Sequence, residues 1–222
     1  MTQTAEQLIR KLIEAMGGEE TAVAIQSIHA IANCTSPHGN YTTEIRSARG
    51  QRLHFEQTWP GNPPFRAIIN GEYAWGADPQ TGDLRRLAKA SIAMLRGHEF
   101  QMMPLTLPER FDQMAVGTAA SFAGKQCATI QAIDELEKPC TLYFDLTTGL
   151  MAGFVIVNPN GEAGETVQTV FNEWQMVDGI QLPRKVTATD SSGDFVLDFH
   201  TITLNKVDGT LFTVPEAIAA GE

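Results

Sequence analysis

Hydrophobic and polar residues alternate with a period of two through residues 140–185, which is the clearest pattern in the chain. Leu142 and Phe144 fall on one side of an extended segment, whereas Thr141 and Tyr143 fall on the other. Turn sequences with glycine at positions 149, 161 and 179 interrupt the alternation. Alternation broken by such turns is typical of an antiparallel meander. The stretch therefore predicts a large β-surface and contains few groups that could carry out chemistry.

The same period predicts further strands on both sides of this meander. The expected ranges are 28–34, 40–48, 52–59, 65–69, 72–76, 119–122, 125–133, 185–189 and 194–204. Residues 4–16 instead repeat apolar residues at helical spacing, with Thr4 as the N-cap and Gly17 as the stop. A second, shorter helix is expected over residues 19–26.

The β pattern stops in residues 84–115, where the spacing of apolar residues predicts a helix over 84–95 that ends at Gly97. Pro104 and Pro108 limit any helix in the following apolar stretch to a few residues. The sequence predicts about ten or eleven strands, an N-terminal helix and a helical insertion near the middle. We assign residues 1–222 to one domain of the α+β class, mainly β.

Composition restricts the partners of such a domain. The chain has 16 Lys and Arg against 26 Asp and Glu, a formal charge of -10, so it repels phosphate backbones and nucleic-acid binding is not expected. The sequence has no run of about eighteen apolar residues, so no transmembrane helix is expected. Charged residues interrupt the N-terminal apolar stretch, which predicts the cytoplasm for the chain as written, or an extracytoplasmic location if a leader was removed.

Residues with catalytic or metal-binding chemistry do not converge in the sequence. The three cysteines, at positions 34, 127 and 140, lack the spacing of a metal or redox motif, and we expect buried free thiols. The five histidines are scattered, and the two pairs that share a strand face, His54 with Glu56 and Asp198 with His200, are expected to be solvated. No nucleophile elbow, P-loop or dinucleotide fingerprint occurs. We therefore expect no catalytic residue, no metal site and no cofactor.

Several turn and packing motifs occur in an order that resembles a known family. In chain order they are Ala15-Met16-Gly17-Gly18, Asn70-Gly71-Glu72-Tyr73-Ala74-Trp75, Leu142-Tyr143-Phe144-Asp145 with Thr148-Gly149-Leu150, Val177-Asp178-Gly179-Ile180-Gln181-Leu182-Pro183, Asn205, Phe212 and Pro215. Together they resemble the outer-membrane lipoprotein-sorting family of the carriers and receptors LolA and LolB, and more closely a branch of uncharacterised proteins with that fold.

This resemblance implies an incomplete β-barrel, in which a curved antiparallel sheet is closed on one side by helices. The concave face of the family's carriers holds acyl chains. The implied partners are therefore a hydrophobic small molecule or lipoprotein acyl chains, together with a protein of the cell envelope. The family works outside the cytoplasm. Its carriers have a single gating arginine, for which Arg46, Arg52 and Arg66 are candidates by strand position.

The candidate cavity is the apolar face of the predicted sheet. Its residues are Phe55, Trp59, Trp75, Phe122, Leu142, Phe144, Phe154, Ile156, Trp174, Phe195, Leu197 and Phe199. A partly wrapped sheet leaves a concave apolar surface that suits a hydrophobic ligand. The same residues would also fill an ordinary core, and periodicity does not separate these interpretations.

A methionine-rich segment of the insertion forms a candidate lid over this face. Its residues are Met94, Leu95, Phe100, Met102 and Met103. Methionine is flexible and polarizable, so it adapts to ligands of irregular shape. The alternative is a helix end that plugs the core.

Three functions remain open from the sequence. Non-enzymatic binding of a lipid, an acyl chain or a lipoprotein best fits a β-surface without catalytic groups. A structural or interaction module of envelope machinery fits if the cavity is filled. A hydrolase or a metal-dependent enzyme with an unrecognised site is third. Because the first choice depends on the fold, an open apolar cleft is the observation that distinguishes it.

Overall fold

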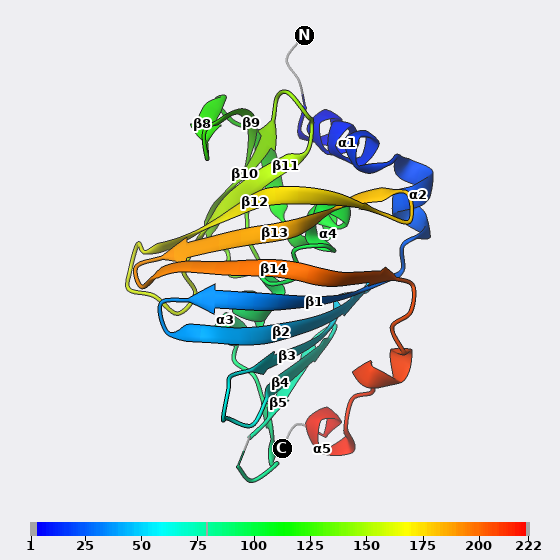
Figure 1. Cartoon of the computed structure of the whole chain (residues 1–222), viewed down its shortest axis with the longest axis vertical. Helices are drawn as coiled ribbons and strands as arrows, with labels where there is room; N and C mark the ends of the chain where they lie inside the picture. Colours follow the sequence, from blue (N-terminus) through cyan, green and yellow to red (C-terminus); the bar gives the residue numbers. More distant parts are fainter. Residues whose placement is uncertain (1–3, 79, 221–222) are drawn as a thin grey trace.

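A computed structural model describes residues 4–78 and 80–220, and all the strands it describes join one antiparallel sheet (Figure 1). The strands are β1 Ser27–Ser36, β2 Gly39–Ala48, β3 Arg52–Thr58, β4 Phe65–Asn70, β5 Tyr73–Ala77, β6 Leu84–Arg86, β7 Asp112–Val116, β8 Ala120–Phe122, β9 Lys125–Ile133, β10 Pro139–Asp145, β11 Met151–Val157, β12 Thr166–Val177, β13 Ile180–Asp190 and β14 Gly193–Leu204. The order is β6-β5-β4-β3-β2-β1-β14-β13-β12-β11-β10-β9-β7, and β8 pairs with β9.

This order makes an incomplete barrel. Within β1 to β6 and within β8 to β14, strands that are consecutive in sequence are neighbours in the sheet. The β1–β14 pair joins these two halves, and β7 pairs with β9 at the far edge. The two edges, β6 and β7, do not pair with each other, so the sheet stays unclosed between them. The chain bridges this gap through the helices α3 Lys89–Arg96 and α4 Leu107–Arg110, with the 3-10 turn η1 Met103–Leu105 between them. The predicted fold class is confirmed.

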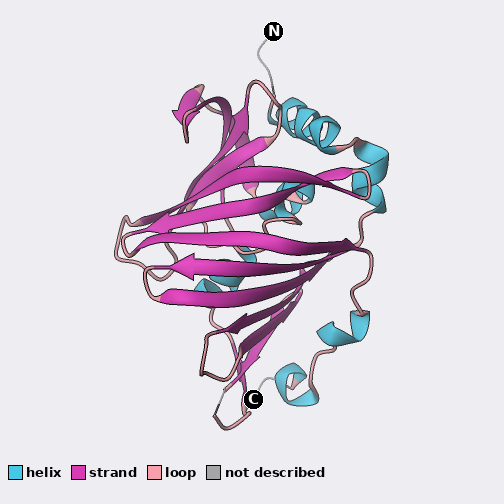
Figure 2. Ribbon diagram, in the orientation of Figure 1, coloured by secondary structure: helices cyan, strands magenta, loops and turns pink. Residues whose placement is uncertain are grey.

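The helices cover the sheet from two sides (Figure 2). In this view α3 and α4 lie behind the sheet, whereas α1 Ala5–Met16 and α2 Glu19–Ala24 lie at one end of it. The C-terminal elements, η2 Gly209–Phe212 and α5 Glu216–Ala219, pack beside strands β3 to β6. No helix in the described part of the chain is long and apolar enough to cross a bilayer.

The N-terminal helix begins and ends where its caps predict. The Thr4 hydroxyl accepts a hydrogen bond from the Gln7 amide, and the Gln7 side chain bonds back to the Thr4 amide, which is a capping box. Gly17 ends the helix at a positive φ of 145°, and a Cβ there would collide with the carbonyl oxygen of Gly179. Two of the family-like motifs therefore meet in space, because the helix stop packs directly on the β12–β13 turn.

Two short edge strands differ from the expected structure. Residues 84–86 form strand β6, so the helix predicted over 84–95 is wrong in its first turn and begins only at Lys89. Strand β7 lies within the stretch in which no strand was expected. All three β6 residues are exposed, and β7 bulges next to Gln113, which has a positive φ of 50°. Neither strand carries the alternation of a half-buried strand.

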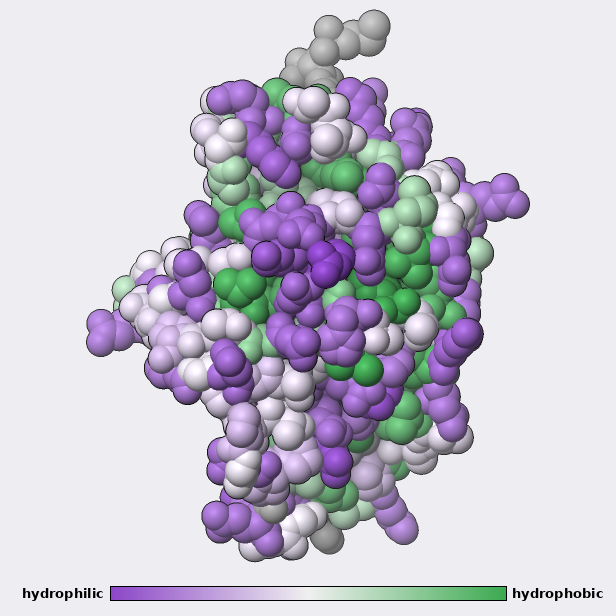
Figure 3. Space-filling view, viewed as in Figure 1, coloured by the Kyte–Doolittle hydropathy of each residue, from purple (hydrophilic) through white to green (hydrophobic). Residues whose placement is uncertain are grey.

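The apolar core lies on the concave side of the sheet. The largest fully buried side chains include Phe154, Phe171 and Phe199. In the space-filling view of the opposite side, hydrophilic side chains gather over the middle of the sheet (Figure 3). On the neighbouring strands β12 and β13, the Arg184 guanidinium lies 2.8 Å from the half-exposed Glu173 carboxylate. The sheet therefore has one apolar and one largely polar face, as alternation predicts.

The three cysteines are free and buried, as expected from the sequence. Cys140 lies opposite Ala132, and Cys127 lies opposite Asp145, so the two thiols are separated along the β9–β10 hairpin. Burial raises the pKa of Cys34 to about 11 and that of Cys140 to about 12. Thiolate formation is suppressed at neutral pH, which makes both groups poor nucleophiles.

Candidate functional site: a cavity between the sheet and the insertion

The structure contains a cavity of about 400 Å³ between the concave face of the sheet and the insertion that begins with α3. Aromatic and aliphatic side chains form most of its wall. The lining residues are Tyr41, Phe55, Gln57, Phe65, Met94, Gly97, His98, Phe100, Phe154, Ile156, Asn158, Pro159, Asn160, Val167, Thr169, Ala188, Asp190, Phe195 and Leu197. The cavity therefore combines an apolar body with a few polar groups, as small-molecule sites commonly do.

Strand periodicity explains how the sheet contributes to this wall. Each of five strands provides two residues that are two positions apart and therefore point to the same face. These pairs are Phe55 and Gln57, Phe154 and Ile156, Val167 and Thr169, Ala188 and Asp190, and Phe195 and Leu197. The cavity floor is thus a continuation of the apolar core toward the hairpin turns.

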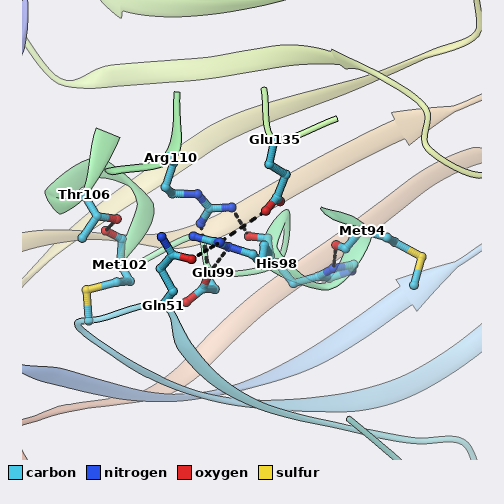
Figure 4. A network of polar contacts seen from close by, with 9 residues as sticks. Gln51, Met94, His98, Glu99, Met102, Thr106, Arg110 and Glu135 are labelled. Atoms are coloured by element: carbon cyan, nitrogen blue, oxygen red, sulfur yellow. Dashed lines mark hydrogen bonds and ion pairs between the residues drawn. The ribbon is translucent and has the colours of Figure 1, made fainter. Parts of the chain in front are cut away.

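The end of α3 forms the opposite wall. The His98 ring lies 5.1 Å from the Phe55 ring and 5.7 Å from the Phe100 ring. Its Nδ1 lies 2.9 Å from the Met94 carbonyl oxygen (Figure 4). Because a carbonyl oxygen only accepts, Nδ1 carries the proton, and the neutral ring leaves Nε2 as an acceptor. Burial lowers the pKa of His98, which favours this neutral form.

The mouth of the cavity lies at the turns after β11 and β13. Asn158, Pro159 and Asn160 come from the β11–β12 loop, and Asp190 ends β13. The Asn160 side-chain amide lies 3.0 Å from the Met94 sulfur, so this loop contacts α3 across the mouth. Thioether sulfur is a weak acceptor, so the contact adds little stability.

A buried ionic cluster anchors the other side of the insertion. Arg110 Nη1 lies 3.2 Å from the Glu99 carboxylate, and Arg96 Nη1 lies 3.2 Å from the Glu135 carboxylate. Arg96 also donates to the Gln51 side chain at 3.1 Å. Figure 4 shows Glu99, Arg110, Glu135 and Gln51 directed toward one another. Gln51 and Glu135 lie in turns on opposite wings of the sheet, so the cluster ties the insertion to both wings.

Glu99 is the least exposed member of this cluster, with 4% of its surface accessible. Burial raises the pKa of Glu99, while the guanidinium groups of Arg110 and Arg96 act to lower it. Burial likewise lowers the pKa of Arg110. Each charge is therefore tolerated only because its partners are present.

Five of the twelve residues predicted for the cavity line it. These are Phe55, Phe154, Ile156, Phe195 and Leu197. Leu142, Phe144 and Phe199 are buried in the main core. Trp174 packs edge-on against core Phe171, and Trp59 stacks at 4.5 Å behind the cavity residue Tyr41.

The last two predicted cavity residues lie on the other side of the sheet. Phe122 belongs to a separate apolar cluster and stacks at 4.0 Å on Tyr143. Trp75 directly follows Ala74 on strand β5, and Ala74 belongs to the main core. Because successive side chains of a strand point to opposite faces, the Trp75 indole points away from the main core.

The candidate lid is divided between the cavity and the core. Met94 and Phe100 line the cavity, whereas Leu95, Met102 and Met103 do not line it and are buried in the core. Met94 is the exposed member of the group.

Sequence reasoning missed most of the polar lining. Gln57 and Asp190 have cavity-facing neighbours two positions away, so strand periodicity could have found them. His98 and Asn160 carry no such signal, because their place depends on where α3 crosses the sheet and how the β11–β12 loop folds over it. Arg46, Arg52 and Arg66 are absent from the described lining of the cavity.

No three His, Cys, Asp or Glu side chains within residues 4–78 and 80–220 gather to hold a metal ion. The prediction that His54 is solvated is wrong, since only 9% of its surface is exposed. His54 Nδ1 instead lies 3.2 Å from the Arg46 guanidinium. Burial, followed by the Arg46 charge, lowers the pKa of His54.

Comparison with solved structures identifies the fold. A LolA superfamily protein from Nitrosomonas europaea superimposes with a TM-score of 0.68 at 12% identity, covering 96% of this chain and 99% of that one. A DUF1329 family protein from Desulfovibrio piger gives 0.63 at 10% identity, covering 98% and 100%. A putative outer membrane lipoprotein-sorting protein domain from Vibrio parahaemolyticus gives 0.58 at 13% identity, covering 92% and 97%. No protein-family model and no curated protein matches the sequence. The chain therefore has the LolA-like fold inferred from its motifs.

Proposed function

We propose that the protein binds one hydrophobic ligand, without catalysing a reaction, in the cavity between the sheet and α3. The observation that carries this proposal is the open apolar space of about 400 Å³. This volume lies near the lower end of the range of about 300–1,000 Å³ typical of small-molecule sites. It suits one slender ligand, such as a single acyl chain, rather than several chains at once.

The distribution of the apolar side chains supports binding over a purely structural role. Much of the concave face is filled, and residues such as Leu142 and Phe199 have no exposed surface. The space remains under Met94, His98 and Phe100, where the insertion crosses the sheet. A module with a filled core would place packed side chains there, because protein interiors are close-packed.

The chemistry of the lining favours binding over catalysis. Among the described lining residues, only His98 and Asp190 carry a carboxylate or an imidazole, and no cysteine or serine joins them. The His98 proton on Nδ1 is directed to a backbone carbonyl. The fold adds to this proposal, since one protein of similar structure is described as a lipoprotein-sorting domain. The biological ligands that we propose are a lipid or an acyl chain carried by a lipoprotein, delivered with an envelope protein.

Native mass spectrometry of protein purified without detergent tests this function. We expect either a co-purifying ligand mass, or saturable binding of the uncharged fluorescent probe N-phenyl-1-naphthylamine after extraction with organic solvent. Unlabelled 1-dodecanol should displace the probe, because both compete for one apolar site. If no ligand mass is found and the probe fluorescence does not saturate, the proposed function is wrong.

A further inference from the structure

The charge of the cavity wall restricts which ligands it can hold. Among the described lining residues there is no lysine and no arginine. The polar groups that do line it are amides, hydroxyls, one imidazole and one carboxylate, from Gln57, Asn158, Asn160, Tyr41, Thr169, His98 and Asp190. A ligand with an anionic head would therefore enter without a charged partner.

The imidazole does not supply the missing charge. Its Nδ1 proton is donated to the Met94 carbonyl oxygen, and aromatic rings pack on its sides. Burial lowers the pKa of His98, so the ring is uncharged at neutral pH. Its remaining polar atom is an acceptor, which pairs with a hydroxyl or amide donor and not with a carboxylate.

The surroundings of the mouth are acidic. Asp190 lies in the lining, and its Oδ1 accepts the Ser192 amide at 2.8 Å. The β11–β12 loop carries Glu162 and Glu165, while residues 157–166 and 190–193 contain no lysine or arginine. Together with the overall charge of -10, this arrangement raises the free energy of an approaching anion.

Two of the three arginines that strand position suggested as gating residues form ion pairs outside the cavity. Arg66 Nε lies 2.6 Å from the Glu56 carboxylate, and Arg46 pairs with Glu44. These residues alternate with core residues such as Ile45, so they face the outer side of the sheet. They cannot receive a head group inside the cavity without a change in strand register.

We infer that the cavity selects an uncharged amphiphile whose polar end donates a hydrogen bond, such as a long-chain alcohol or a monoacylglycerol, and discriminates against fatty-acid and phosphate anions. This inference depends on the proposed function, because it specifies the ligand of the same cavity. The physical reason is that a buried anion requires a paired charge, whereas a hydroxyl requires only an acceptor.

Competition with ligands of equal chain length tests the selectivity. Bound N-phenyl-1-naphthylamine is displaced at about pH 8, where laurate is ionised, by 1-dodecanol, 1-lauroylglycerol or laurate, each below its micelle concentration. We expect both uncharged ligands to bind at least tenfold more tightly than laurate. Laurate affinity within tenfold of both would overturn the selectivity while leaving the proposed function intact. Failure of the probe itself to bind would defeat the proposed function and the inference with it.

Two variants separate head-group recognition from the greater water solubility of laurate. Gln57→Arg places a cation in the cavity wall and should raise the ratio of laurate affinity to 1-dodecanol affinity at least tenfold. Thr58→Arg adds the same charge on the next residue of β3, which alternation places on the outer face, and should leave the laurate-to-dodecanol ratio unchanged. An equal ratio in Gln57→Arg and wild type, in correctly folded protein, would refute the inference.

Discussion

Replacing Ala188 by phenylalanine tests whether the space under α3 is empty in solution. Ala188 lies in the cavity lining on β13, two residues after core Val186 and opposite Phe195 of β14. Its methyl group therefore points from the sheet into the cavity, and a phenyl ring at this position enters the space that a ligand would occupy.

The sign of the stability change distinguishes an empty cavity from a packed core. Burying a phenylalanine side chain is worth about 1.5–3 kcal/mol relative to leaving it in water. Part of that gain is lost because the ring is immobilised. In a cavity of about 400 Å³ the ring fits without displacing its neighbours, so we expect the free energy of unfolding to stay equal or rise by about 1 kcal/mol. Overpacking a filled core would instead cost about 1–3 kcal/mol.

Urea denaturation measures this change, and displacement of N-phenyl-1-naphthylamine measures the site in the same protein. Ala188→Phe should lose probe binding while retaining its stability. Val196→Phe is the matched control, because Val196 lies between two cavity residues on β14 and faces the outer side. Loss of more than about 1 kcal/mol together with unchanged probe binding would show that the cavity is not where the ligand binds.

Three further predictions concern the ionic cluster, the end of α1 and His98. Arg110→Met should cost about 3 kcal/mol in urea denaturation, because it removes the nearer of the two guanidinium groups that pair with buried Glu99 and leaves only Arg96 at 3.7 Å, and adding Glu99→Gln should recover part of that loss. An equal cost in the single and double variants would contradict this account. Gly17→Ala should cost at least about 1 kcal/mol more than Gly18→Ala, since both have positive φ but only the first would collide with a neighbouring carbonyl. Burial lowers the pKa of His98, so the unfolded chain takes up its proton first and stability falls as pH drops below about 6.5, by at most about 1.4 kcal/mol per pH unit. Denaturation of His98→Gln should show a shallower slope between about pH 6.5 and 5, and an unchanged slope would refute this assignment.

The strands and the first helix were predictable because local signals specify them. Thr4 and Gly17 mark the ends of α1, and period-two alternation specifies both the strand ranges and their apolar face. The same signals fail for β6 and β7, since short exposed edge strands bury no face and need no alternation. The fold could therefore be inferred apart from these two edges.

The position of the cavity could not be predicted from the same signals. Phe154 and Phe144 both lie on the apolar side of the sheet, yet only Phe154 reaches the cavity. The difference arises from the path of residues 94–100 across the sheet, and that path depends on contacts between residues far apart in sequence. Arg96, for example, contacts Gln51 and Glu135, which are 45 and 39 positions away from it along the chain.

The buried ionic cluster also explains why the apolar insertion does not move into the cavity and fill it. Moving the segment inward would separate the nearly buried Arg96 from Glu135 and Gln51, which lie in turns of the sheet, and loss of partners for a buried charge costs free energy. The hydrophobic gain from closing the cavity is opposed by this electrostatic cost, so the insertion is held above the sheet. At the mouth, by contrast, the amide–thioether contact at Met94 joins the two sides weakly. The insertion is therefore held strongly at the ionic cluster and only weakly at the mouth of the cavity. We expect a ligand to enter between α3 and the β11–β12 loop.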